Sequence, residues 1–305
     1  MSIIGIVAHD AGGSEVLSHW VSQNIDQANF KYLLDGPAIN IFKKNLKREF
    51  FLNQKNIEPF IEECDSFICA TSWKSDLEKK IIKEAAKKKK RVASVLDHWI
   101  NYRERFLLNG DIYLPNEIWV CDKYALDIAS RSFPDMKLKL IKNPYLESLK
   151  KRIKSVKRKS NKIKNRRVLY VCEPIAEHSQ IQYGDQNFLG YDENSAIRYF
   201  FENINLLNID FDKILIRPHP SESVDKYKWV KGEFRNFDIS IEAESELLEE
   251  IVNSEIVVGC ESMAMVVALE VNKRVFTSIP PNGRECVLPH KSIKSMSKEI
   301  SDYGV

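Results

Sequence analysis

Hydrophobic and polar positions along the chain alternate in two patterns. Short runs of apolar and β-branched residues alternate with longer stretches in which apolar residues recur every three or four positions. The short runs predict buried strands, and the longer stretches predict amphipathic helices that pack against them. This alternation is typical of α/β proteins built on parallel sheets.

The alternation occurs in both halves of the chain. In the first half we expect strands at 3–8, 31–34, 66–70, 91–96, 117–121 and 137–141, and helices at 15–24 and 75–90. In the second half we expect strands at 168–172, 213–216, 237–241, 255–259 and 274–277, and helices at 195–207, 246–253 and 262–271. The predicted fold is α/β, with two Rossmann-like doubly wound domains facing a central cleft. In such sheets ligands bind beyond the carboxyl ends of the strands.

A basic segment separates the two halves. Residues 150–167 contain 11 Lys or Arg and no acid, so the rest of a chain whose net charge is +3 carries −8. Because the positive charge is confined to one block, we expect no nucleic-acid partner. We expect an acceptor-side domain at 1–149, a linker at 150–167 and a nucleotide-sugar-binding domain at 168–305. The segment is a solvated linker, or a linker that also contacts an anionic membrane at about 1 kcal/mol per basic residue near the surface.

The overall composition narrows the class of protein further. The chain of 305 residues is 44% hydrophobic and 29% charged, which is typical of a globular protein. No apolar run approaches the ~20 residues needed to span a bilayer, and the first residues lack the basic region of a secretory signal. The six cysteines are scattered and form no CxxC pair, which favours reduced thiols. We therefore expect a cytoplasmic protein, with peripheral contact at the inner face of the membrane if the basic segment binds there.

The segment after the first predicted strand combines an acid with paired glycines. It reads His9-Asp10-Ala11-Gly12-Gly13-Ser14-Glu15. Glycines allow a tight turn and a close approach to a ligand, and a helix N-terminus favours anions. Asp10 is a candidate base and Ser14 a candidate cap or ligand contact, although an ordinary capped turn has the same pattern. The full GxGxxG pattern is absent, which disfavours a nicotinamide oxidoreductase.

Two segments of the second half also follow strands. In Arg217-Pro218-His219-Pro220-Ser221-Glu222 two prolines flank the histidine and restrict the backbone around it. Such a histidine suits phosphate recognition or protonation of a leaving group, while Arg217 either binds phosphate or forms a structural ion pair. In Gly259-Cys260-Glu261-Ser262 the serine either caps a helix or binds phosphate with the helix amides, and Glu261 is a candidate for sugar hydroxyls.

The last polar segments lie in the first half. Residues 96–106, LDHWINYRERF, place Asp97, His98, Tyr102 and Arg103 in one short stretch after a strand. Aromatic rings beside cations are typical of sugar or carboxylate recognition, although a capped helix with surface ion pairs has the same composition. Residues 70–73, ATSW, are a weaker candidate of the same kind.

No pattern in the sequence predicts a metal site or a cofactor. HExxH and the P-loop are absent, and no cluster of His and Cys has ligand spacing. One DxD, Asp210-Phe211-Asp212, precedes a predicted strand, which places it away from the expected cleft.

The RPHPSE and GCESMA segments resemble the nucleotide-binding half of GT-B glycosyltransferases, and in particular bacterial sialyltransferases and polysialyltransferases. The resemblance implies that His219 and Ser262 bind the phosphate of a CMP-sugar donor and that Asp10 stands where the family has its base. The order His-Asp-Ala-Gly-Gly and the single Ser262 after Glu261 depart from the family pattern. If Asp10 is not the base, Asp97 is the next candidate.

The sequence therefore leads to an inverting, metal-independent glycosyltransferase without a cofactor. Its donor would be a CMP-linked nonulosonate and its acceptor a bacterial surface glycan or a lipid-linked glycan, as the resemblance implies. Two alternatives stay open. Non-hydrolysing UDP-N-acetylglucosamine 2-epimerases share the fold but carry a glycine-rich DSGG-type turn that is missing here. A non-catalytic nucleotide-sugar-binding module is the other.

Overall fold

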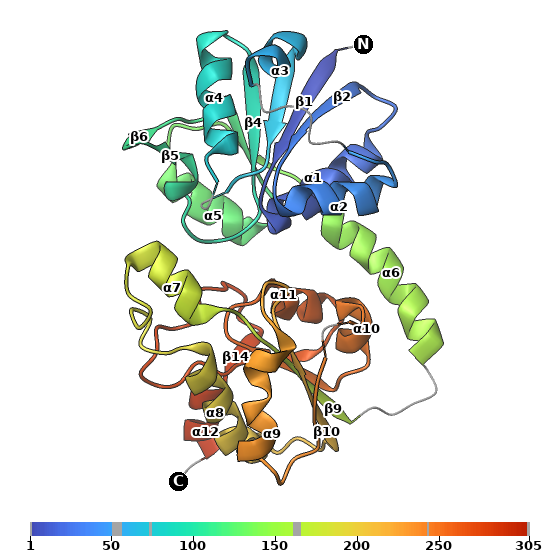
Figure 1. Cartoon of the computed structure of the whole chain (residues 1–305), viewed down its shortest axis with the longest axis vertical. Coiled ribbons are helices and arrows are strands. Elements are labelled where there is room, and N and C mark those ends of the chain that lie inside the picture. Colours follow the sequence, from blue (N-terminus) through green and yellow to red (C-terminus); the bar gives the residue numbers. More distant parts are fainter. Residues whose placement is uncertain (1, 51–56, 73–74, 161–165, 243, 304–305) are drawn as a thin grey trace. The chain divides into compact units, whose positions relative to one another are not determined.

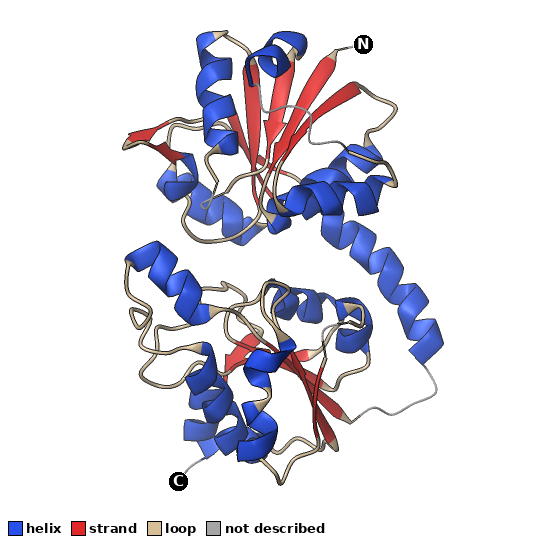
Figure 2. Cartoon of the chain, viewed as in Figure 1, coloured by secondary structure: helices blue, strands red, loops and turns tan. Residues whose placement is uncertain are grey.

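The computed structural model describes residues 2–50, 57–72, 75–160, 166–242 and 244–303. The chain divides into two compact units, Met1–Leu149 (unit 1) and Lys150–Val305 (unit 2). Each unit is built on a six-stranded parallel sheet with helices packed against it (Figures 1 and 2). The predicted fold class of two Rossmann-like doubly wound domains is thereby confirmed.

The sheet of unit 1 has the order β2-β1-β3-β4-β7-β8. Its strands are β1 (Ile3–Ala8), β2 (Asn29–Leu34), β3 (Ser66–Cys69), β4 (Arg91–Leu96), β7 (Glu117–Val120) and β8 (Leu138–Leu140), and a small antiparallel hairpin consists of β5 (Leu107–Leu108) and β6 (Asp111–Ile112). The helices are α1 (Ala11–Gln23), α2 (Pro37–Leu46), α3 (Ile57–Glu63), α4 (Leu77–Lys87), the 3₁₀ turn η1 (Glu104–Phe106) and α5 (Lys123–Ser132).

Alternate residues of β1 show why this sheet is covered on both faces. Ile6 and Ala8 pack in one cluster with Leu17 of α1 and Phe42 of α2. Gly5 faces the other side, where a Cβ atom would lie 2.5 Å from the Phe67 ring. Because both faces are buried, the strands are continuous apolar runs rather than alternating ones.

The sheet of unit 2 has the order β11-β10-β9-β12-β13-β14. Its strands are β9 (Arg167–Val171), β10 (Lys213–Arg217), β11 (Ile239–Ile241), β12 (Ile256–Gly259), β13 (Arg274–Thr277) and β14 (Ile293–Ser295). Its helices are α7 (Ile175–Tyr183), α8 (Glu193–Asn203), α9 (Trp229–Glu233), α10 (Leu247–Val252), α11 (Met263–Glu270) and α12 (Met296–Tyr303), with 3₁₀ turns η2 (Ile204–Leu207) and η3 (Val224–Tyr227). One face carries a core in which Tyr170 of β9 packs with Phe200 of α8 and Met296 of α12.

The predicted linker is in large part a helix. Helix α6 (Pro144–Ser160) begins before residue 150 and includes more than half of the basic segment. A solvated linker would leave its side chains exposed, but Ile153 is 6% exposed, close to the 3% of Leu149. Lys150 and Arg152 form ion pairs with Glu270 and Glu246 of unit 2. Residues 161–165 lie outside the described residues.

Topology indicates where each unit is expected to bind a ligand. In an open parallel sheet, that place is the carboxyl edge where the strand order reverses. The reversal lies between β1 and β3 in unit 1 and between β9 and β12 in unit 2. Within the described residues, no helix has both the length and the apolarity to cross a membrane.

Candidate functional site

The loop after β1 places His9 and Asp10 at the switch point of unit 1. Asp10 precedes α1, but its carboxylate makes no capping hydrogen bond to that helix. Its Oδ1 lies instead 2.7 Å from His9 Nδ1, and the two side chains are 21% and 24% exposed. The carboxylate that we expected to act as a base is therefore accessible and is oriented by an imidazole.

The three residues expected to line a ligand after Asp10 have different surroundings. Ser14 is fully buried, and its hydroxyl donates to the Asp10 carbonyl at 2.6 Å, so it is neither the cap nor exposed to a ligand. Gly13 is buried, and a Cβ atom there would lie 2.7 Å from the Ala70 side chain. A Cβ atom on Gly12 would lie 2.1 Å from Asp97 Oδ2. The glycines thus allow α1 to approach β3 and β4, and Gly12 alone of the three is exposed.

Asp97, at the end of β4, belongs to a buried ion pair. Its Oδ1 accepts a hydrogen bond from Arg105 Nη1 at 2.8 Å, and the two side chains are 11% and 5% exposed. Arg105 also donates to the hydroxyl of Thr71 at 3.0 Å. Arg103, the arginine that we expected to contact substrate, is exposed. The pair links the loops after β3 and β4, and it leaves the Asp97 side chain less exposed than that of Asp10.

His98 and Tyr102 lie in the same loop and carry buried polar atoms. Neither His98 Nδ1 nor the Tyr102 hydroxyl has a hydrogen-bond partner among the described residues. Burial lowers the pKa of His98 to about 4, so the ring is neutral at pH 7. A buried polar atom without a partner costs free energy. These two side chains are therefore candidates for contacts with the hydroxyl groups of a ligand.

The weaker candidate after β3 is structural where it is described. The Thr71 hydroxyl donates to the Val95 carbonyl at 2.9 Å, and Ser72 Oγ accepts from the Ser75 amide at 2.8 Å. Both side chains are buried. Trp73 lies outside the described residues.

In unit 2 the expected phosphate contact of Arg217 is replaced by a structural ion pair. Arg217 Nη1 donates to Glu250 Oε2 at 2.6 Å, and the two side chains are 16% and 3% exposed. The same nitrogen donates to the Ser245 carbonyl at 2.8 Å. Of the two interpretations that the sequence left open for Arg217, the ion pair is the one present.

His219 is oriented by its own loop. The backbone amide of Ser221 donates to His219 Nδ1 at 3.2 Å, and the Ser221 hydroxyl lies 2.7 Å from the same atom. Because an amide N–H can only donate, Nδ1 is the acceptor and the ring proton of the neutral imidazole is on Nε2. The Glu222 carboxylate accepts hydrogen bonds from the His219 amide and the Tyr227 hydroxyl. It thereby connects the loop of His219 to Tyr227. The loop therefore presents an N–H donor beyond the end of β10.

The switch point of unit 2 carries two acids and a serine. Glu173 follows β9, and its Oε2 accepts from the Glu261 amide at 2.7 Å. Burial raises the pKa of Glu173 to about 8 and also raises that of Glu261. Glu261, expected to bind hydroxyls, accepts from the Val287 amide and lies 3.4 Å from Arg284 Nη2. Ser262 caps α11 by accepting from the Ala264 amide at 3.2 Å, and this geometry leaves its hydroxyl proton available.

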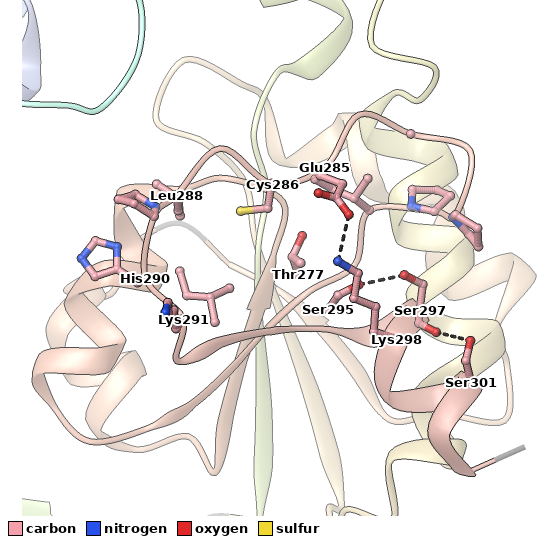
Figure 3. A pocket seen from close by; sticks show the side chains of 16 residues that line it. Thr277, Glu285, Cys286, Leu288, His290, Lys291, Ser295, Ser297, Lys298 and Ser301 are labelled. Carbon is pink, nitrogen blue, oxygen red and sulfur yellow. Dashed lines mark hydrogen bonds and ion pairs between the residues drawn. The ribbon is translucent and has the colours of Figure 1, made fainter. Parts of the chain in front are cut away.

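A cavity of about 520 Å³ lies at the ends of β13 and β14, beneath the segment 279–291 (Figure 3). Thr277, Cys286, His290 and Ser295 are among the residues that line it. The Thr277 hydroxyl donates to the Cys260 carbonyl at 3.0 Å, which connects the cavity to the loop that carries Glu261. Burial raises the pKa of Cys286 to about 12, so this thiol is not an activated nucleophile.

Sequence reasoning missed two charged residues that the structure places at these sites, Glu173 and Glu78, and it named a third, Arg105, without separating it from its neighbours. Glu173 directly follows a predicted strand, so the rule that identified Asp10 and Asp97 could have found it. Arg105 was named only as part of its segment, and nothing in the sequence distinguishes it from Arg103. Glu78, buried under the loop after β1, lies in a helix of ordinary amphipathic pattern and gave no signal.

No three His, Cys, Asp or Glu side chains in the described part of the chain are grouped to hold a metal ion. The two acids of the DxD segment lie on Arg166, with Asp212 Oδ1 3.3 Å from Nη2 and Asp210 closer. This contact is at the amino end of β10, opposite to His219.

No protein-family model matches the chain, and no curated protein matches it in sequence. Solved structures do match. The Methanocaldococcus jannaschii UDP-GlcNAc 2-epimerase in complex with UDP-GlcNAc and UDP is 13% identical, with a TM-score of 0.62 over 98% of this chain and 91% of that one. The Neisseria meningitidis UDP-GlcNAc 2-epimerase bound to UDP-GlcNAc is 12% identical, with a TM-score of 0.60 over 90% and 82%.

S. aureus MnaA in a co-structure with UDP is 9% identical, with a TM-score of 0.61 over 92% of this chain and 80% of that one. At such low identity these similarities establish the fold and not the activity. Both units of the chain therefore have the GT-B-like architecture of UDP-GlcNAc 2-epimerases.

Proposed function

We propose that this protein is a nucleotide-sugar enzyme of the 2-epimerase type, acting on a UDP-linked N-acetylhexosamine. The observation that carries the proposal is the grouping of His219, Glu173 and Ser262 after three adjacent strands of unit 2, at and beside its switch point. The fold supports it, since the similar structures of the M. jannaschii and N. meningitidis enzymes contain UDP-GlcNAc. From the sequence alone the transferase was the expected activity and the epimerase the alternative, and the fold favours the epimerase.

The chemistry of such an epimerisation assigns a role to each group. A base removes the proton from C2 of the sugar while the bond between C1 and the UDP oxygen breaks, which leaves a C1–C2 double bond and free UDP. UDP then adds back to C1, and C2 takes a proton on its other face. His219 Nε2–H and the Ser262 hydroxyl would bind the departing phosphate, and Asp10 would take the C2 proton.

In this scheme Glu173 is a protonated acid that can donate a hydrogen bond or a proton. Since burial raises its pKa to about 8, the side chain is mostly protonated at pH 7. A neutral acid beside Ser262 tolerates a phosphate that an ionised acid would repel. We therefore place Glu173 among the phosphate-binding groups.

A second candidate is an inverting transferase that uses a CMP-linked nonulosonate and a glycan acceptor. Two observations favour it: the clamped His219 of the RPHP segment, and the start of α11, which reads Ser262-Met263-Ala264 without glycine. In that case Asp10 would deprotonate the acceptor hydroxyl rather than a carbon atom. The two candidate reactions share the phosphate site. They differ in whether the proton on C2 of the sugar is removed and replaced.

Deuterium exchange separates them. The protein is incubated in D₂O with UDP-GlcNAc, with UDP-ManNAc and with a CMP-nonulosonate, and the products are followed by NMR. Epimerisation replaces the C2 proton with deuterium and yields the other hexosamine, whereas transfer or hydrolysis of a CMP-sugar releases CMP without such exchange. Binding of UDP without either reaction would contradict both proposals and leave a binding module. His219→Ala is the control for a contaminating activity.

A further inference from the structure

Glu78 is a buried acid that the proposed function does not use. It lies in the first turn of α4 and is 1% exposed. Its Oε1 accepts a hydrogen bond from the backbone amide of His9 at 2.8 Å, directly below the loop that carries Asp10. Its Oε2 is buried and has no hydrogen-bond partner among the described residues.

Among the described residues, no Lys or Arg side chain forms an ion pair with Glu78. Asp10 and His9 face it from the end of β1, and Cys69 faces it from the end of β3. On its own helix, the nearby Lys79 is paired with Asp76 at 3.1 Å. From α3, Glu62 meets the far end of α4, where it pairs with Lys88. Near the β5–β6 hairpin, Lys83 stacks on Tyr113.

Burying a carboxylate with one oxygen unpaired is costly, so the neutral acid is the favoured form. The electrostatics agree with the geometry: the pKa of Glu78 is raised from 4.5 to about 7, mainly by burial and also by the charge of Asp10, while hydrogen bonds from its own backbone amide and from that of His9 act against the rise. The charge of His9 acts in the opposite direction and lowers the pKa of Glu78. Two neighbouring acids in such different surroundings can have different roles: Glu78 keeps its proton, and Asp10 accepts one.

We propose that Glu78 and Asp10 form a coupled carboxyl pair in which Glu78 holds a proton, so that Asp10 is the member that acts as the base. This inference rests on the proposed function for the role of Asp10, but not for the state of Glu78. Glu78 is a positioning residue: it fixes the His9–Asp10 segment through one oxygen and controls the charge beneath it through the other. When Glu78 ionises, the added negative charge disfavours an anionic substrate at the loop.

The first experiment follows the proton and requires no substrate. The infrared carbonyl band of a protonated carboxylic acid is recorded as a function of pH for the wild type and for Glu78→Gln. We expect a difference band that disappears as the pH rises through about 7. In Asp10→Asn the midpoint moves to lower pH, because the charge of Asp10 no longer opposes ionisation. Glu84→Gln, a half-exposed acid on the same helix paired with Lys87, is the matched control and leaves both unchanged.

A midpoint that is the same in the wild type and in Asp10→Asn would overturn the coupling, and the absence of a difference band would overturn the proton on Glu78. The Asp10→Asn measurement keeps Glu78 in place, so it decides the question even if Glu78→Gln folds poorly.

The second experiment uses turnover of the nucleotide sugar identified above. We expect kcat of the wild type to fall on the alkaline side of about pH 7, while Glu78→Gln keeps its activity there. An unchanged alkaline limb in Glu78→Gln would contradict the proposed role in catalysis. If no nucleotide sugar is turned over, the proposed function fails, and the infrared result for Glu78 still stands or falls separately.

Discussion

At the scale of single residues, His219 is fixed by contacts within four positions of the chain. The Ser221 amide and hydroxyl hold Nδ1, which directs the Nε2–H away from the loop. We expect His219→Ala to fold normally and to lower turnover by ~10²-fold or more, which is the range of general acid–base effects. Ser221→Ala should have a smaller effect, because the amide still donates to Nδ1. Steady-state kinetics with circular dichroism checks both, and His19→Ala, in the middle of α1, is the control. Wild-type turnover in His219→Ala would exclude the assignment.

In the proposed phosphate site, Glu173 should make UDP binding depend on pH. Its pKa is about 8 in the native protein against 4.5 ordinarily, so the folded state favours the protonated form. As the pH rises through about 8, the side chain ionises and repels the phosphate, and UDP affinity should fall. Glu173→Gln should bind UDP with less dependence on pH across that range. Calorimetry between about pH 7 and about pH 9 measures both, and equal slopes for the two proteins would remove Glu173 from the site.

The residues that the sequence predicted can be recognised from the local pattern, and their distant partners cannot. Asp10, Asp97 and His219 each follow an apolar run, and a polar residue at the end of a buried strand is visible in the pattern. The partners that determine their roles are not visible. Glu78 reaches His9 across 69 positions and Glu250 reaches Arg217 across 33, and no local rule predicts contacts over such distances.

At the scale of elements, the buried pair of Asp97 and Arg105 connects β4, the loop after β3 and the start of α1. Removing one member of a buried pair typically costs ~3–5 kcal/mol because the other charge is left uncompensated. We therefore expect Arg105→Met to lower the free energy of unfolding by about that amount. Arg103→Met, two positions away and exposed, should change it by less than about 0.5 kcal/mol. Urea unfolding of both variants tests this, and equal stabilities would show that Asp97 does not depend on Arg105.

Elements were predictable where burial on both faces makes the strand a continuous apolar run. β1, β4 and β13 have the predicted bounds, β10 and β12 differ by one residue at one end, and β9 is displaced by one residue. Helix α6 was not predicted, because a run of like charges indicated a solvated linker. In the structure Leu149 and Ile153 occur four positions apart and are both buried, so a narrow apolar stripe was enough to support a helix there.

At the scale of the whole molecule, the cations of the basic segment 150–167 that the structure describes include paired and exposed ones. Lys150, Arg152 and Arg166 lie in ion pairs with acids of unit 2, which is what a linker anchored to its own domain requires. Lys151 and Lys154, on the same helix, are exposed. At about 1 kcal/mol per basic residue near an anionic leaflet, the exposed cations would give weak and reversible attachment.

We therefore expect co-sedimentation with anionic vesicles at low salt and not with neutral vesicles. The attachment should disappear at high salt, because the Debye length falls from ~10 Å at 0.1 M to ~3 Å at 1 M. Replacing Lys151 and Lys154 with Gln should weaken it, while the same change at Lys80 and Lys87, exposed on α4 of unit 1, should not. Equal recovery in the supernatant with both vesicle types at both salt concentrations would leave the segment as a linker alone, because attraction between opposite charges cannot be independent of lipid charge and of salt.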